Sequence, residues 1–249
     1  MCGIIKSSDN GTFFVPENCS VFVNLQPMTQ LTFTEENYVK SIYALQERNA
    51  SGEVSVNEIA ERMQTKPATV TDMLRKLSDK ELIHYEKYKK IRLSPTGVQQ
   101  ALQIVRKHRL WETFLYHTLH FSWDEVHEVA EQLEHIHSQK LITRLDEFLG
   151  FPKYDPHGDP IPTASGDMPA TRAILLSEVN IPAAECKIVA VKDSSSAFLQ
   201  QLKRFGLEID VPIRVLERLP YDNSLLIATS GEPFLISEKI AENILVMPC

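Results

Sequence analysis

A histidine-rich and acidic stretch near the middle of the chain has the residue types and the spacing of a metal site. An α-helix would place four of its side chains on one face, at positions i, i+4, i+7 and i+8: His127, Glu131, Glu134 and His135. A second pair, His108 and Glu112, is spaced i, i+4 within an apolar stretch. Imidazole and carboxylate donors on two neighbouring helices predict a site for a divalent ion such as manganese, iron, cobalt or zinc.

Two other interpretations of these residues stay open at this point. A solvated acidic face with hydrogen-bonded histidines would have the same composition. The order His127-Glu128-x-x-Glu131 also approaches the His-Glu-x-x-His arrangement of metallohydrolases. Position 131 is glutamate, however, and no separate general base is evident, so we do not expect an enzyme.

The charge of the chain is unevenly distributed. The 249 residues carry a formal net charge of −7, which by itself argues against a nucleic-acid partner. Residues 66–92, however, hold eight Lys or Arg against four acidic residues, and residues 124–147 hold seven acidic residues against two basic ones. Because binding depends on the local field, the first segment suits a polyanion and the second suits cations.

The cysteines and the hydropathy of the chain indicate where in the cell the protein is expected. The four cysteines lie far apart, lack the C-x-x-C spacing of thiolate zinc sites and provide no disulfide framework. The sequence has no apolar run of about 18 residues, the length that a spanning helix needs. We therefore expect a cytoplasmic protein without a membrane span.

Periodicity and breaker residues divide the chain into five segments. Residues 1–27 show little helical period and are expected to be a disordered or non-native leader. Three short helices and a basic hairpin fill residues 28–95, which is the order of a winged helix-turn-helix. Long helices are predicted for residues 96–151, a Pro-rich linker for 152–174 and a small β-barrel for 175–249.

The element boundaries follow from caps, breakers and apolar periods. Thr34 is the expected N-cap of the first helix, and Pro67 suits the first turn of the third. The predicted helices are 35–45, 55–63, 67–80, 96–119, 196–204, and 123–149 with a break near 137–141. The predicted strands are 83–86, 91–93, 187–191, 211–215 and 225–228.

The third predicted helix and the hairpin after it are the candidate DNA-reading elements. In a winged helix-turn-helix the second helix of the motif enters the major groove, and its early turns meet the bases. Candidates on this helix for contact with bases, sugars or phosphates are Lys66, Ala68, Thr69, Thr71, Asp72, Arg75 and Lys76. The wing offers Tyr85, Lys87, Tyr88, Lys89 and Lys90. Wing contacts would add affinity with little sequence information, although a basic turn can also be simply solvated.

Seven short motifs follow one another along the chain: Val56 to Ala60, Ala68 to Leu77, Leu82 to Tyr88, Leu93 to Gly97, Arg106 to Glu112, Glu131 to His135 and Gly158 to Pro162. Together they resemble the family of the diphtheria toxin repressor and the manganese transport regulator, over residues 30–249. The resemblance implies a mainly α protein with a winged helix-turn-helix, a helical metal-binding and dimerisation domain and a C-terminal SH3-like (FeoA-like) β-barrel. It further implies a repressor that binds an inverted-repeat operator in double-stranded DNA as a homodimer when loaded with metal.

The resemblance also assigns metal roles, one residue at a time. Glu131, Glu134 and His135 match the family's central triad, and His108, Glu112 and His127 match its ancillary site. Two positions of the first helix depart from the pattern: Asn37 stands where relatives have Met or Asp, and Lys40 replaces a manganese-type Glu. Asn37 is thus a weaker ligand candidate, and Lys40 removes a ligand. In the last domain only Asp193 could serve, as a weak candidate.

The types of donor atom indicate which ion the site prefers. Iron-type members of the family place sulfur donors at positions matching Asn37 and Glu131, whereas this chain has oxygen donors there. Oxygen donors favour Mn(II), with Fe(II) as the alternative. A winged-helix regulator that does not depend on metal, or that senses another ligand through its last domain, is the main competing prediction.

Overall fold

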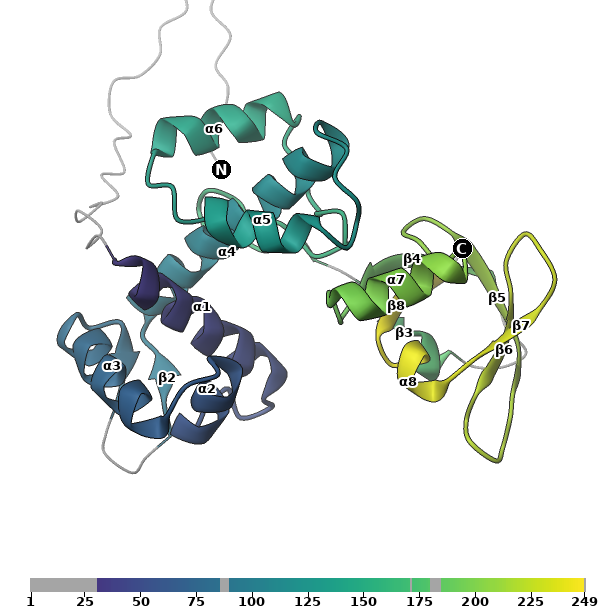
Figure 1. Cartoon of the computed structure of the whole chain (residues 1–249), viewed down its shortest axis with the longest axis horizontal. Helices are drawn as coiled ribbons and strands as arrows, with labels where there is room; N and C mark the ends of the chain where they lie inside the picture. Colours follow the sequence, from purple (N-terminus) through teal and green to yellow (C-terminus); the bar gives the residue numbers. More distant parts are fainter. Residues whose placement is uncertain (1–30, 86–89, 171, 180–184, 249) are drawn as a thin grey trace, which may run out of the picture. The chain divides into compact units, whose positions relative to one another are not determined.

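The computed structural model describes residues 31–85, 90–170, 172–179 and 185–248 (Figure 1). The expected leader, residues 1–27, and the wing residues Lys87, Tyr88 and Lys89 lie outside this part, so the predictions about them stay open. Among the helices described, none combines the length and the apolar character needed to cross a membrane.

Three helices and a short hairpin form the first domain. They are α1 (Phe33–Arg48), α2 (Val56–Arg62), α3 (Pro67–Asp79), β1 (Ile83–His84) and β2 (Arg92–Leu93). Strands β1 and β2 pair antiparallel, and Val54 adds a bridge to Ile91. Fully buried side chains from each helix, such as Ile42, Ile59 and Leu74, share one core. This is the predicted order of a winged helix-turn-helix.

Helix α1 begins two residues before the predicted start, because Thr32 and not Thr34 is its N-cap. The Thr32 side chain accepts a hydrogen bond from the backbone N–H of Glu35, and the Glu35 carboxylate accepts one from the backbone N–H of Thr32 at 2.8 Å. This capping box satisfies two N–H groups that no helical carbonyl reaches. Ser55 and Glu58 start α2 in the same way, at the predicted position.

The second domain consists of α4 (Pro95–His117), α5 (Val126–Leu133) and α6 (Gln139–Phe148). The predicted break between the last two helices exists but comes earlier in the chain, at residues 134–138. Helix α6 begins there because the Ser138 side chain accepts a hydrogen bond from the backbone N–H of Leu141. Glu134 is therefore the C-cap of α5 and His135 lies in the turn that follows, so the helix predicted to run through residue 135 ends at Leu133.

Residues 152–170 are irregular, as predicted, but they pack closely against other elements. Arg106 and Arg109 of α4 donate hydrogen bonds to the carbonyls of Pro162 and Pro160, at 2.6 and 2.5 Å. On the other side, the backbone N–H of Val191 donates to the carbonyl of His157 at 3.0 Å. The segment is thus fixed to α4 and to the C-terminal sheet, unlike a flexible linker.

Gly158 lets this segment lie directly against the sheet. Its φ is +83°, a conformation that favours glycine, and a Cβ at this position would lie 1.9 Å from the carbonyl oxygen of Val189. The neighbouring Asp155 and His157 are buried.

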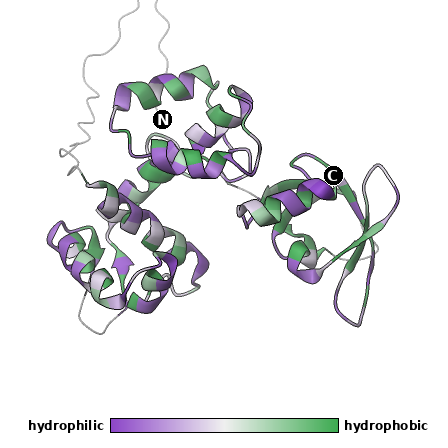
Figure 2. Cartoon of the chain, in the orientation of Figure 1, coloured by the Kyte–Doolittle hydropathy of each residue, from purple (hydrophilic) through white to green (hydrophobic). Residues whose placement is uncertain are grey.

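The last domain is a six-stranded antiparallel sheet with the order β3-β8-β4-β5-β6-β7. Its elements are β3 (Ile174–Leu175), the 3₁₀ turn η1 (Leu176–Glu178), β4 (Glu185–Val191), α7 (Ser196–Arg204), β5 (Pro212–Arg218), β6 (Leu225–Ala228), β7 (Phe234–Ile236), α8 (Glu238–Ala241) and β8 (Ile244–Pro248). Helix α7 has the predicted bounds. Hydrophobic and hydrophilic residues both occur along α5, α6 and α7 (Figure 2), consistent with helices that bury one face.

Candidate metal centre

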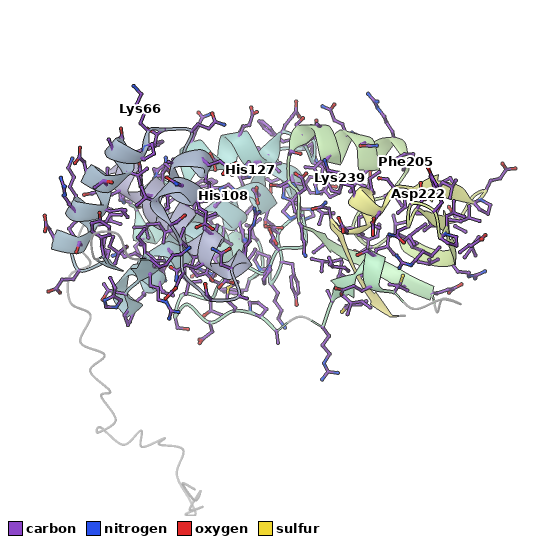
Figure 3. The ribbon with its side chains drawn as sticks, turned by 90° about the horizontal axis from the view of Figure 1, so that it is seen from below. Lys66, His108, His127, Phe205, Asp222 and Lys239 are labelled. Atoms are coloured by element: carbon purple, nitrogen blue, oxygen red, sulfur yellow. The ribbon has the colours of Figure 1, made fainter. Side chains whose placement is uncertain are left out.

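Helices α4 and α5 bring three of the predicted ligands together. His108 and Glu112 lie one turn apart on α4 and are buried, whereas His127 lies in the first turn of α5 and is partly exposed. Figure 3 shows His108 and His127 in neighbouring positions, and their ring centroids are 4.9 Å apart. The Oε1 atom of Glu112 lies 2.9 Å from His108 Nε2 and 3.1 Å from His127 Nδ1, and the two nitrogens are 3.1 Å apart.

These distances fit a divalent ion. Metal–ligand bonds of about 2.1 Å at right angles place neighbouring ligand atoms about 3.0 Å apart. A single hydrogen bond joins only two atoms, whereas here each atom lies within 3.1 Å of both others. One carboxylate and two imidazoles with such spacing form three adjacent ligands of a first-row ion.

The other nitrogen of His108 fixes the orientation of the ring. His108 Nδ1 lies 2.6 Å from Oε2 of Glu134, a side chain that is 1% exposed. A proton on Nδ1 leaves the lone pair on Nε2, which is the nitrogen that faces Glu112 and His127. Burial lowers the pKa of His108, but the charge of Glu112 and the hydrogen bonds that the ring donates to both carboxylates outweigh it, so its pKa rises to about 8.

Lys40 of α1 occupies the place between the other predicted ligands. Its Nζ lies 2.6 Å from Glu134 Oε2, 3.4 Å from Glu131 Oε1 and 3.3 Å from His108 Nδ1. Burial raises the pKa of Glu134, but His108 and Lys40 lower it more. An ammonium group among these donors disfavours a metal ion at the same point, so the residues here do not fit the family's central site.

His135 also has a different partner from the one expected. Its Nδ1 lies 2.5 Å from Oε2 of Glu36, a buried carboxylate on α1, and its ring packs at a tilt of 40° against Phe33. Asn37 is half-buried, and in the described residues no hydrogen bond joins its side chain to a predicted ligand. Glu36 was not predicted, although Glu36 and Lys40 are spaced i, i+4 and so share a face of α1.

A second cluster of ligand-type side chains, also not predicted, lies on the other side of Glu112. In the described part of the chain, Asp155 and His157 bring ligand atoms to within 4.8 Å of one another and of Glu112. Burial and the charge of Glu112 raise the pKa of Asp155 well above its usual value. Burial lowers the pKa of His157, but its hydrogen bond to Glu112 and the Glu112 charge raise it to about 9 overall. The signal in the sequence that could have indicated this cluster is a histidine inside the Pro-rich segment.

Asp193 lies outside both clusters. It is half-buried in the loop before α7, and its Oδ1 accepts a hydrogen bond from the backbone N–H of Ser195 at 2.8 Å.

The predicted DNA-reading residues of α3 are mostly solvent-accessible. Lys66 is the N-cap residue and points outward (Figure 3), and Ala68, Thr69, Asp72, Arg75 and Lys76 are exposed. Thr71 is half-buried and donates a hydrogen bond to the carbonyl of Pro67. In the wing, Lys90 is exposed and Tyr85 packs partly against the core.

Comparisons with known proteins agree with this architecture. Residues 30–91 match the model of the iron dependent repressor, N-terminal DNA binding domain, and residues 94–163 match its metal binding and dimerisation domain. Residues 175–248 match the FeoA domain. The chain is 27% identical over 230 residues to the iron-dependent repressor IdeR of Mycobacterium leprae, covering 88% of this chain and 99% of that one.

Solved structures give the same result. A manganese-dependent transcriptional repressor in complex with manganese is 33% identical, with a TM-score of 0.78, covering 86% of this chain and 100% of that one. ScaR with bound Cd²⁺ is 32% identical, with a TM-score of 0.72 and coverage of 86% and 99%. With three domain models in order and a similar solved structure matched along its full length, the chain belongs to the iron-dependent repressor family, which includes the diphtheria toxin repressor.

Proposed function

We propose that this protein is a metal-dependent transcriptional repressor that binds an inverted-repeat operator in double-stranded DNA as a homodimer. The observation that carries the proposal is the group of three mutually adjacent donor atoms from His108, Glu112 and His127 on α4 and α5. Family membership supplies the link between such a site and DNA binding.

The ion is a divalent first-row metal, with Mn(II) favoured and Fe(II) as the alternative. The centre offers imidazole nitrogen and carboxylate oxygen and contains no thiolate, and donors of this kind suit Mn(II) without excluding Fe(II). Similar proteins include both manganese-dependent and iron-dependent repressors. One similar structure is of a manganese-dependent repressor with manganese, and similar curated proteins are named iron-dependent repressors.

A short chain of contacts connects the centre to the DNA-binding domain. A bound ion would supply positive charge beside His108 Nε2, and the Nδ1–H group of His108 would donate a hydrogen bond to Glu134. Glu134 also accepts a hydrogen bond from Lys40 of α1 at 2.6 Å. Helix α1 packs in the core of the winged helix-turn-helix. The contact with Glu134 thus links the metal centre to the reading head, which is where a sensor needs a differential interaction.

Surface features support the DNA and dimer parts of the proposal. The exposed basic residues Lys66, Arg75 and Lys76 suit phosphate contacts beside the bases read by α3. The helical domain exposes two large apolar side chains at the end of α6, Phe148 and Phe151, which are 66% and 65% exposed. Paired apolar surfaces of this kind suit a two-fold interface, and two reading heads then match an inverted repeat.

The test is a mobility-shift assay on duplexes selected from a random library in the presence of Mn(II). We expect a shift that chelator abolishes and that Mn(II) or Fe(II) restores. His127→Ala should lose the metal response, because it removes the partly exposed ligand of the centre. His117 is an exposed histidine on the same domain, and His117→Ala should keep the response. A shift that persists in chelator would indicate a regulator that does not depend on metal. If the selection retained no duplex at all, DNA binding would be refuted.

A further inference from the structure

Asp72 places a negative charge among the basic side chains on the exposed face of α3. Its side chain is 70% exposed, and the neighbouring exposed cations are Lys66, Arg75 and Lys76. A carboxylate on this face repels phosphate groups, so it lowers the affinity for every duplex whatever its sequence. Asp72 can therefore contribute to DNA recognition only through the bases, which carry hydrogen-bond donors.

The buried side of α3 directs Asp72 outward. Val70, Leu74 and Leu77 are fully buried in the core of the first domain, and the helix begins at Pro67. Asp72 follows five residues after Pro67, so its Cα lies about 7.5 Å further along the helix axis. It thus belongs to the early turns, which in a winged helix-turn-helix meet the base edges in the major groove.

Asp72 is the only charged side chain among residues 67–74. The Thr71 hydroxyl donates a hydrogen bond to the carbonyl of Pro67 at 3.0 Å, within its own helix. Thr69 is exposed but carries no charge. The strongest hydrogen-bond acceptor that the early turns offer to DNA is therefore the carboxylate of Asp72.

Arg75 holds one oxygen of Asp72 and leaves the other available. The NH1 group of Arg75 donates a hydrogen bond to Oδ1 of Asp72 at 3.1 Å. Both side chains are largely exposed, so this pair adds little to stability, but it orients the carboxylate. Within the part of the chain that the structure describes, Oδ2 of Asp72 has no hydrogen-bond partner, and it can accept a hydrogen bond from DNA.

The donors in the major groove determine which base such an oxygen can bind. An ionised carboxylate only accepts hydrogen bonds. Guanine presents two acceptors in this groove and thymine presents one, so both repel a carboxylate, whereas cytosine and adenine each present an amino group. Adenine also presents the acceptor N7 beside its amino group, while cytosine presents its N4 amino group alone. Cytosine is thus the base that a carboxylate fits best.

We propose that Asp72 selects a cytosine in each half of the operator by accepting a hydrogen bond from the N4 amino group of that base. The inference rests on the proposed function, because it requires that α3 enters the major groove. Loss of such a contact at one base pair lowers the affinity about 5–150-fold. The same carboxylate repels the phosphates of other DNA, so Asp72 also increases selectivity by weakening binding to duplexes that lack the cytosine.

The test compares the sequences that the protein selects from a random duplex library in the presence of Mn(II). The unaltered chain should select one invariant cytosine in each half-site. Asp72→Asn should change that position to adenine, because an asparagine side chain pairs with the amino group and N7 of adenine. Asp79→Asn is the matched control, because it removes another exposed carboxylate from α3, about two turns beyond Asp72, and it should leave the selected sequence unchanged.

Substituted bases identify which side chain reads the base pair, since each cytosine faces a guanine. Replacing the cytosine with pyrimidin-2-one, which lacks the amino group, should weaken binding by the unaltered chain about 5–150-fold. Replacing the opposite guanine with 7-deazaguanine, which lacks the acceptor N7, should leave the affinity unchanged. The reverse result would mean that Arg75 reads the guanine, and it would overturn the role of Asp72.

The results separate this inference from the proposed function. A selected site without an invariant cytosine, or one that Asp72→Asn leaves unchanged, would overturn the inference while DNA binding stands. If the unaltered chain selected no duplex, the proposed function would fail and the inference with it. The base substitutions use the unaltered chain, so their result holds even if a variant does not fold.

Discussion

Replacing Lys40 with methionine tests whether its ammonium group holds α1 to the helical domain. Lys40 is 17% exposed and Glu134 is 1% exposed, and their charged atoms are 2.6 Å apart. Lys40→Met leaves Glu134 buried with two histidines as its remaining partners, His108 at 2.6 Å and His135 at 3.7 Å. Removing one member of a buried ion pair costs about 3–5 kcal/mol, and we take the lower end, about 3 kcal/mol, because Lys40 keeps some contact with solvent.

Thermal unfolding of the metal-free protein measures this loss. For a chain of this size about 1 kcal/mol lowers the melting temperature by about 2–4 °C, so Lys40→Met should lower it by about 6–12 °C. The same substitution in a Glu134→Gln background should cost much less, because no uncompensated carboxylate is left behind. Lys187→Met is the matched control: Lys187 lies 2.6 Å from Asp210, but the two side chains are 45% and 73% exposed. That change should cost about 0–1 kcal/mol.

A melting temperature of metal-free Lys40→Met within 2 °C of the wild type would refute the reasoning, and so would an equal loss in the Glu134→Gln background. Either result would mean that the ammonium group contributes no net attachment of α1, and that the contacts of Lys40 with Glu134 and His108 are incidental.

Three other outcomes are expected. The pKa of His108 is raised to about 8, so Mn(II) must displace a proton at lower pH, and calorimetry should show an apparent affinity for Mn(II) that rises about tenfold per pH unit up to about pH 8. In the metal-free protein the same raised pKa stabilises the fold. This contribution to the free energy of unfolding is complete below about pH 6.5 and is lost as the pH rises through about 8. Lys66→Ala and Arg75→Ala should each lower the salt dependence of DNA binding by about 0.9 in log–log slope, and an unchanged slope would remove that residue from the phosphate contacts. Gly158→Ala should destabilise the protein by about 1–3 kcal/mol in urea unfolding, because its Cβ would overlap the Val189 carbonyl, whereas Gly231→Ala, with open space around it, should be nearly neutral.

The sequence alone predicts most of the fold, because its caps and breakers act locally. Ser55 starts α2 with Glu58, and Ser196 to Arg204 is a helix with the predicted bounds. The start of α1 was misplaced because Thr32 and Thr34 are both good caps, and only Thr32 has a glutamate three positions later. The end of α5 was misplaced because the polar period continues through residue 135, whereas the backbone turns after Leu133.

The candidate site was harder to predict, since it depends on which side chains meet across elements. His108 and Glu112 follow from a local i, i+4 spacing, and the structure places them together with His127. The pairing of Lys40 with Glu134 joins residues 94 positions apart, and no local spacing indicates it. Asp155 and His157 were missed for a similar reason, because their burial depends on how the Pro-rich segment packs between α4 and β4.

The uneven exposure of the three donors in the first centre has a kinetic consequence. His127 is 37% exposed, whereas the side chains of His108 and Glu112 are 8% and 3% exposed. His127 is thus the donor of this centre that solvent reaches most readily, and it would hold an ion from the open side of the site. At the cluster of Glu112, Asp155 and His157 no side chain is more than 3% exposed, so solvent reaches these groups only when the packing of the Pro-rich segment opens. Exchange of an ion at the first centre would therefore follow changes in metal concentration without such an opening.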